Sequence, residues 1–263
     1  MSPSPIPVSA VVARLRAAGC VFAEDEAELL VSTARTPAEL AGMVERRAGG
    51  LPLEHVLGWA RFCGLRVAVE PGVFVPRPRT EFLIRQAVAL ARRAGRPPVV
   101  LDLCCGTGAM GAAVAAALGE GAEVHAADLD PAAVRCARLN LPGGHVHQGD
   151  LYDALPGSLR GRVGILIASP PYVPTESVGL LPPEARLHEP LMALDGGGDG
   201  LDVVRRVIAG ASGWLAPGGH LLVETSERQA AATVRAAVAA GLPARATVSE
   251  ELDATAVIAT RPA

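Results

Sequence analysis

From Thr80 to its C-terminus, the chain alternates between apolar runs of strand length and segments with helical periodicity. The strand-like runs lie at 98–104, 123–130, 145–148, 163–169 and 220–225, with a closing pair at 244–250 and 254–260. The segments with helical spacing flank these runs, at 81–94, 108–118, 131–139, 200–211 and 227–240. Strands that alternate with helices form parallel sheets with helices on both faces. The sequence therefore predicts an α/β fold with a doubly wound, seven-stranded, mostly parallel sheet, to which the closing pair adds an antiparallel edge.

The N-terminal residues 1–52 have the pattern of short helices instead. Thr36 is suited to be an N-cap, Pro37 to be the first helical residue, and Glu39 to complete a capping box. Gly49 and the glycine after it are a stop signal. A helical unit of this size is too short for a catalytic core, and we expect it to be a recognition domain.

Two further boundaries follow from the spacing of glycine and proline. In residues 53–76, short β-rich pieces alternate with these two residue types, which predicts a β-hairpin linker. The remaining residues, 77–263, hold the whole alternating pattern and are predicted to form the main domain.

The composition argues against several classes of function. The 263 residues carry a formal net charge of −3, so we expect no broad basic face for nucleic acid. The five cysteines lack metal-ligand spacing, and reduced cytoplasmic thiols are the plain interpretation. His145 and His147 have strand spacing without an evident third ligand, so no metal is predicted. Neither a signal peptide nor a membrane span is visible, which predicts a cytoplasmic protein with no membrane contact.

The first predicted strand leads into a glycine-rich turn, Gly106-Thr107-Gly108, just before a helix. Glycines let the backbone approach a ligand closely, and a helix N-terminus favours a carboxylate or phosphate. Cys104 stands where a dinucleotide-binding fingerprint has its first glycine, so the match to that fingerprint is weak. A tight strand-to-helix turn without a ligand is the alternative.

Acidic residues follow the next two strands. Asp128 ends its strand about twenty residues after the turn, where a carboxylate can accept both hydroxyl groups of a ribose. Asp130 starts the following helix and is expected to cap it. Asp150 and Leu151 follow the third strand, and the pair suits the exocyclic amine and the ring of an adenine. A helix cap at Asp150 is the alternative.

The fourth strand ends in Ser169-Pro170-Pro171-Tyr172. The two prolines make a stiff turn, and the carbonyl oxygen of Pro170 is left free as an acceptor. Taken alone, the segment could also be a proline-terminated strand whose tyrosine belongs to the core.

Taken together, "DLCCGTGAMG", "AADLDP" and "SPPY" resemble the class I S-adenosylmethionine-dependent methyltransferases. More narrowly, the chain resembles the HemK/PrmC family of protein-glutamine N5-methyltransferases over essentially its whole length. The segments that carry this narrower resemblance are "PLEHVLGWARFCGLRVAVEPGVFVPRPRTEF", "HEPLMALDGGGDGLDVVRRVI" and "LAPGGHLLVETSERQ".

The resemblance implies a Rossmann-like enzyme that methylates the side-chain amide of a protein glutamine, typically in the Gly-Gly-Gln motif of a release factor. The implied partner is a peptide-chain release factor or another translation protein. The implied contacts to S-adenosyl-L-methionine come from Asp102, Cys104, Gly106, Thr107, Gly108, Asp128, Leu129, Asp150, Leu151 and Ser169. The implied substrate contacts come from Phe74, Pro170, Pro171, Tyr172 and Glu189, and the implied catalytic residues are Ser169, Pro170 and Tyr172.

The implied chemistry explains the residue types. An amide nitrogen is a poor nucleophile, so the enzyme must orient it and direct its N–H bonds onto acceptors. Tyr172 and Phe74 are expected to be flat walls on either side of the amide. Cys104, in place of a glycine, is expected to point its side chain away from the cofactor.

Ser169 departs from the family pattern, which has Asn-Pro-Pro-Tyr. A serine hydroxyl is shorter and rotatable, and it can donate as well as accept. Three alternatives to glutamine methylation therefore stay open. The acceptor could be a nitrogen or oxygen of a small molecule, or a nucleic-acid adenine, against which the charge balance speaks. The protein could also be catalytically weakened and bind a translation factor only.

Overall fold

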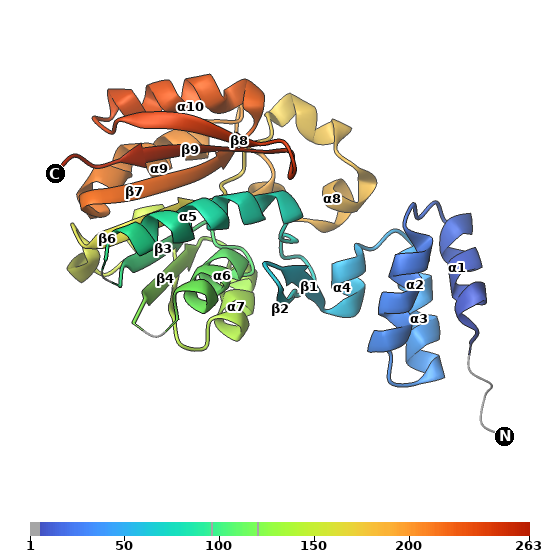
Figure 1. Ribbon diagram of the computed structural model, residues 1–263. Coiled ribbons are helices and arrows are strands. Elements are labelled where there is room, and N and C mark those ends of the chain that lie inside the picture. The colour runs from blue at the N-terminus through green and yellow to red at the C-terminus, as the bar shows by residue number, and fades with distance from the viewer. Residues whose placement is uncertain (1–5, 96, 120) are drawn as a thin grey trace.

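The computed structural model describes residues 6–263 apart from residues 96 and 120. Figure 1 shows a helical N-terminal part beside a larger α/β part, with a short hairpin between them. The N-terminal part contains α1 (Val8–Ala17), α2 (Ala23–Thr33), α3 (Pro37–Ala48) and α4 (Leu53–Leu57). These helices bury their apolar faces in one small core, formed by Val11, Leu15, Leu30, Leu40, Met43 and Val56 among others.

Helix α3 begins where the sequence predicts. The Thr36 hydroxyl accepts the N–H of Glu39 at 3.1 Å, and Pro37 is the first helical residue. The Glu39 carboxylate, however, accepts the N–H of Arg35 at 2.8 Å. In a standard capping box the Glu39 carboxylate would accept the N–H of Thr36, but here it accepts that of the preceding residue. The N–H groups of Arg35 and Glu39 are nevertheless both hydrogen-bonded.

Residues 53–76 are less β-rich than the sequence predicts. Their first five residues are α4, which packs Val56 into the helical core and ends at Gly58, whose φ is +78°. The hairpin itself comprises β1 (Trp59–Phe62) and β2 (Leu65–Ala68), paired antiparallel. A short 3-10 helix, η1 (Pro78–Thr80), then leads into the main domain. The boundaries at residues 52 and 76 stay predictions.

The main part contains the predicted seven-stranded sheet, in the order β5-β4-β3-β6-β7-β9-β8. Strands β3 to β7 are parallel, and β9 is antiparallel to both β7 and β8. The strands are β3 (Val99–Leu103), β4 (Glu123–Asp128), β5 (His145–Gln148), β6 (Val163–Ala168), β7 (Leu215–Thr225), β8 (Ala244–Ser249) and β9 (Ala254–Thr260). The expected fold class is confirmed. Strand β7 begins earlier than predicted because Leu215 already pairs with Val163 before an irregularity in the register.

Helices cover both faces of this sheet, as Figure 1 shows. One face packs against α5 (Glu81–Arg93), α6 (Ala109–Leu118) and α7 (Pro131–Asn140), and the other against α9 (Asp202–Trp214) and α10 (Glu227–Ala239). Successive residues of β3 alternate between the two cores, since Val100 belongs to the first and Leu101 to the second. No helix in the described part of the chain is long and apolar enough to cross a bilayer.

The strand order reverses between β3 and β6, so a crevice opens beyond their carboxyl ends. The long connection from β6 to α9 lies beside this edge and is only partly irregular. It contains η4 (Thr175–Leu180), α8 (Pro183–His188) and η5 (Leu191–Ala193). Two further 3-10 turns, η2 (Leu151–Ala154) and η3 (Gly157–Leu159), join β5 to β6.

A buried arginine ties the helical part to this connection. The Arg47 guanidinium of α3 donates to the Glu26 carboxylate at 2.6 and 3.0 Å and to the Glu184 carboxylate of α8 at 2.6 Å. Arg47 and Glu26 are both buried, whereas Glu184 is half-exposed. A buried ion pair stabilises a fold mainly because removing one partner leaves the other charge uncompensated.

We expect Arg47→Ala to lower the free energy of unfolding by about 3–5 kcal/mol, because Glu26 is then left buried without its counter-ion. The matched control is Arg14→Ala, which removes an exposed pair with Glu45 and is expected to cost much less, because solvent screens an exposed pair. Urea denaturation of both variants measures the difference. Equal costs would contradict the structural role of Arg47.

Candidate active site

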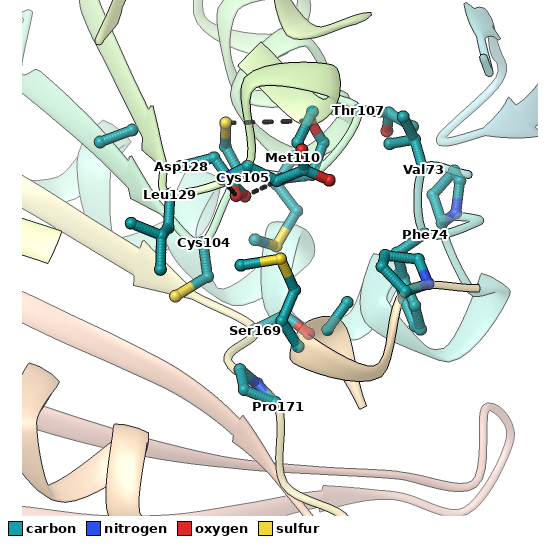
Figure 2. Close-up of a pocket in the computed structure, with 18 of the residues that line it drawn as sticks. Val73, Phe74, Cys104, Cys105, Thr107, Met110, Asp128, Leu129, Ser169 and Pro171 are labelled. Carbon is teal, nitrogen blue, oxygen red and sulfur yellow. Dashed lines mark hydrogen bonds between the residues drawn. The ribbon is translucent and has the colours of Figure 1, made fainter. Parts of the chain in front are cut away.

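A cavity lies at the carboxyl edge of β3, β4 and β6, and residues from all three strand ends line it (Figure 2). The predicted site residues that line this cavity are Phe74, Cys104, Gly106, Thr107, Asp128, Leu129, Asp150, Leu151, Ser169 and Pro171. The predicted site residues outside the lining are Asp102, Gly108, Pro170, Tyr172 and Glu189. The structure thus brings together the residues that directly follow the strands.

The turn after β3 has backbone angles that glycine favours. Gly106 and Gly108 have φ values of +52° and +73°. A Cβ atom on Gly108 would lie 2.9 Å from the Cβ of Ala137 on α7, so packing also requires a glycine there. Gly108 therefore supports the turn from behind rather than lining the cavity.

Cys104 differs from the expectation that it points away from the site. Its side chain lies among the cavity-lining residues (Figure 2), and its φ of +56° is a left-handed value that a non-glycine residue adopts at a cost. Burial raises the pKa of the Cys104 thiol, so the group is neutral at physiological pH.

The Asp128 carboxylate is oriented by two backbone donors. One oxygen accepts the N–H of Gly106 at 2.8 Å and the other accepts the N–H of Asp130 at 2.9 Å. Burial raises the pKa of Asp128. Each carboxylate oxygen retains a lone pair for a ligand in the cavity. Asp130 caps α7 as predicted, since its side chain accepts the N–H of Ala132 at 2.8 Å.

Asp150 and Leu151 follow β5, whose end pairs with that of β4 at Asp128, and both line the cavity. The Asp150 carboxylate is half-exposed and forms an ion pair with Arg206 of α9 at 2.7 Å. Asp150 precedes η2 but forms no side-chain cap bond, so the alternative of a helix cap is wrong. Leu151 has a φ of +48° and places an apolar side chain at the cavity.

Asp102 lies two residues before Cys104, the first residue after β3 that lines the cavity. It is fully buried in β3, and one carboxylate oxygen accepts the N–H of Gly111 at 2.8 Å. The other oxygen has no hydrogen-bond partner among the described residues. Burial raises the pKa of Asp102 to about 8. The expectation of a cofactor contact is therefore corrected: Asp102 fixes the start of α6 through its hydrogen bond to Gly111.

Tyr172 also departs from its expected place as a wall of the cavity. Its hydroxyl accepts from the Arg79 guanidinium at 2.6 Å and lies 3.5 Å from the Glu224 carboxylate. Burial raises the pKa of Tyr172 to about 12, so the phenol stays protonated. Pro171 lines the cavity in its place, just below Ser169 in Figure 2.

Glu189 braces the loops instead of contacting a substrate. Its carboxylate accepts the N–H of Val75 at 3.1 Å and pairs with the Arg77 guanidinium at 2.6 Å. The Arg77 guanidinium in turn lies 4.8 Å from the centroid of the Phe74 ring. Glu189 therefore holds the segment that presents Phe74 to the cavity.

The sequence reasoning missed Glu224, a buried carboxylate in β7. One of its oxygens accepts the Ser169 hydroxyl at 3.0 Å and the Thr80 hydroxyl at 2.6 Å. The other oxygen lies 3.4 Å from Nε of Arg79. The available signal was an acidic residue at the end of an apolar strand, in "HLLVET", where a buried charge requires partners.

The histidines form a stacked group away from the cavity. The His125 ring stacks on His145 and on His147, and its two ring nitrogens bond His147 and Glu123, each at 3.0 Å. Among the described residues there is no group of three or more side chains with the geometry of a metal site.

Comparisons with known proteins agree with this geometry. A family model described as "Methyltransferase domain" matches residues 100–170. The chain is 38% identical to a release factor glutamine methyltransferase of Mycolicibacterium smegmatis over 87% of this chain and 86% of the relative. It is 41% identical to a 4-amino-L-phenylalanine/4-methylamino-L-phenylalanine methyltransferase of Streptomyces pristinaespiralis, over 72% of this chain and 65% of the relative.

A solved structure supports the fold. The crystal structure of a methyltransferase from Pyrococcus furiosus superposes with a TM-score of 0.56 at 16% identity, over 76% of this chain and 90% of that one. The seven-stranded sheet has its cavity where the strand order reverses, and the family model matches the strands that form this edge. The protein is therefore a methyltransferase. The sequence identity to the curated relatives extends over most of the chain, and it identifies the family more narrowly. The chain belongs to the release factor glutamine methyltransferase family. The expected family resemblance is thereby confirmed.

The raised pKa of Asp102 predicts a pH dependence of stability. A folded-state pKa of about 8 lies above the unfolded value of about 3.9, so the unfolded state releases its proton first. Stability from this group is complete below about pH 4 and is lost as the pH rises through about 8. We expect Asp102→Asn, which stays neutral, to gain stability relative to wild type across that window in denaturant unfolding.

Asp195→Asn is the control, because the pKa of Asp195 is shifted in the opposite direction to that of Asp102. The Thr175 hydroxyl bond lowers the pKa of the half-buried Asp195, so the contribution of Asp195 to stability is lost as the pH falls through the acid range. A difference between wild type and Asp102→Asn that does not change between about pH 4 and 8 would contradict the burial argument.

Proposed function

We propose that this methyltransferase transfers the methyl group of S-adenosylmethionine to the side-chain amide nitrogen of a glutamine in a peptide-chain release factor. The observation that carries the proposal is the 38% identity to a release factor glutamine methyltransferase, which extends over 87% of this chain. The extent matters because residues 77–263 make up only about 71% of the chain (187 of 263), so a match over 87% must also include part of the residues before them. A substrate that acts in translation also implies a cytoplasmic enzyme.

The cavity fits the cofactor by the chemistry of its lining. In this proposal the oriented Asp128 carboxylate accepts the two ribose hydroxyl groups, for which its oxygens retain lone pairs. Leu129 and Leu151 contact the adenine ring, and Asp150 accepts its amine. Gly106 and Thr107 let the backbone approach the amino-acid end. Bound in this way, S-adenosylmethionine supplies an electrophilic methyl group on a sulfonium centre.

The chain's own residues then hold the acceptor. Phe74 and Pro171 confine the planar amide between apolar surfaces at the cavity. The Ser169 oxygen, which lines the cavity, accepts one amide N–H group and aligns the nitrogen with the methyl group. Pro170 lies between two lining residues but outside the lining itself, so its carbonyl stays a predicted second acceptor. In the transfer, the nitrogen would gain the methyl group as the bond between that group and sulfur breaks. The thioether would be the leaving group, and the surplus proton of the nitrogen would pass to water. Much of the rate comes from this orientation, because the amide lone pair is weakly nucleophilic.

The helical residues 1–52 are the proposed recognition domain for the protein partner. Arg47 connects them to α8 in the connection that follows Ser169. A protein docked on the helices would therefore contact a segment that continues into the catalytic turn. The formal net charge of −3 gives no support to a nucleic-acid substrate.

A second acceptor is favoured by a specific observation. The relative from Streptomyces pristinaespiralis is named for 4-amino-L-phenylalanine, whose acceptor is an aromatic amine, and it is 41% identical to this chain. Ser169 is the residue of the catalytic turn that departs from the glutamine-specific pattern. The aromatic amine of a free amino acid is therefore the second candidate.

We expect wild-type enzyme to transfer radiolabelled methyl groups from S-adenosylmethionine to a release factor, with no label on a Gly-Gly-Gln→Gly-Gly-Ala factor. The reason is that the missing amide is the proposed acceptor. 4-Amino-L-phenylalanine is assayed in parallel, and Ser169→Asn is tested on both acceptors. Label on 4-amino-L-phenylalanine alone would contradict the glutamine proposal and favour the second candidate.

A further prediction concerns the cofactor. We expect Asp128→Ala to weaken S-adenosylmethionine binding at least about 100-fold in calorimetry, because two hydrogen bonds to a charged group are lost. The control is Thr36→Ala, which removes the cap of α3 outside the cavity and costs about 1 kcal/mol of stability without changing that affinity. Unchanged affinity of Asp128→Ala would remove the ribose assignment.

A further inference from the structure

We propose that Glu224 is a positioning residue, which turns the Ser169 hydroxyl into a fixed hydrogen-bond acceptor for the substrate nitrogen. The inference rests on the proposed function, since it concerns the same acceptor. A serine at position 169 needs such a partner. A free hydroxyl rotates and can donate its proton toward the cavity, where an amide N–H needs an acceptor.

The contacts of Glu224 determine the direction of the Ser169 proton. The Ser169 oxygen lies 3.0 Å from one Glu224 oxygen, and an ionised carboxylate can only accept. Serine must therefore be the donor, and its single proton points at Glu224. The lone pairs of the Ser169 oxygen are then free for the cavity, which Ser169 lines (Figure 2).

Other donors hold the carboxylate in the orientation that this requires. Thr80 donates to the same oxygen at 2.6 Å. Arg79 and Tyr172 lie 3.4 and 3.5 Å from the other oxygen. Glu224 is only 4% exposed and does not line the cavity, so it acts through Ser169 rather than on the substrate.

The same arrangement predicts what a neutral side chain would do. In Glu224→Gln the amide group has one accepting end and one donating end. The cationic Arg79 favours the accepting end on its side, which leaves the NH₂ group facing Thr80 and Ser169. Ser169 then accepts from this NH₂ group and turns its own proton toward the cavity. The substitution thus inverts the hydrogen-bonding polarity of Ser169 with almost no change of shape.

The test is a double-mutant cycle of wild type, Ser169→Ala, Glu224→Gln and the double variant, assayed for methyl transfer to a release factor. We expect Glu224→Gln to lower kcat about 100-fold with KM for the release factor unchanged within about twofold, since the lost contact orients the reacting group. In the Ser169→Ala background, the same substitution is expected to lower kcat less than about threefold.

Glu189→Gln is the matched control. Glu189 is also a buried carboxylate that braces a loop of the site, but it contacts Val75 and Arg77 instead of Ser169. We expect Glu189→Gln to change kcat by the same factor in the wild-type and Ser169→Ala backgrounds. A Glu224→Gln effect that is equal in the two backgrounds, or that falls on KM instead of kcat, would overturn the positioning role.

Thermal melting of the same four proteins separates this inference from the proposed function. We expect Glu224→Gln to shift the melting temperature by a different amount in the wild-type and Ser169→Ala backgrounds, because the two side chains are hydrogen-bonded. Wild-type protein that binds S-adenosylmethionine but methylates no release factor contradicts the proposed function. Equal melting shifts in the two backgrounds contradict the role of Glu224, whichever acceptor the enzyme uses.

Discussion

Parallel pairing of β3 with β4 on one side and β6 on the other determines where the site lies. Leu103 pairs with both Ala127 and Ala168, so three strands end at one edge of the sheet. The chain leaves each strand there, and the following loops converge on one cavity. Because the strand order reverses between β3 and β6, no helix crosses the gap between them. The catalytic turn and the glycine-rich turn can therefore face each other directly.

The sequence predicted this sheet well because its central strands β3, β4 and β6 are buried on both faces and appear as continuous apolar runs. The elements it missed are α4 and α8, at 53–57 and 183–188. Both follow a proline and are shorter than two full turns, so neither has the periodicity that indicates a helix. α4 is helical because Val56 packs into the N-terminal core, which is a tertiary contact that local patterns do not reveal.

The same distinction applies to the site. Residues at or just after a strand end, such as Asp128 and Ser169, line the cavity, because a strand end is visible in sequence. Their contacts to cofactor and substrate stay predictions. The predicted cofactor contact of Asp102 was wrong because this residue lies inside β3, where burial excludes it from the cavity. Glu224 was missed because its place depends on register: Ala168 pairs with Val223, which brings the next residue of each strand side by side. No local pattern specifies that pairing.

This register also limits which residues position 169 can hold. A carboxylate buried as deeply as Glu224 must be surrounded by donors, and Ser169 is one of them together with Thr80. A side chain at 169 must therefore donate toward β7 while it presents an acceptor to the cavity. Serine and asparagine meet both requirements, whereas alanine meets neither and aspartate would place a second negative charge against Glu224. In this environment the replacement of asparagine by serine keeps the hydrogen-bonding polarity of the turn, although it shortens the reach to the acceptor nitrogen.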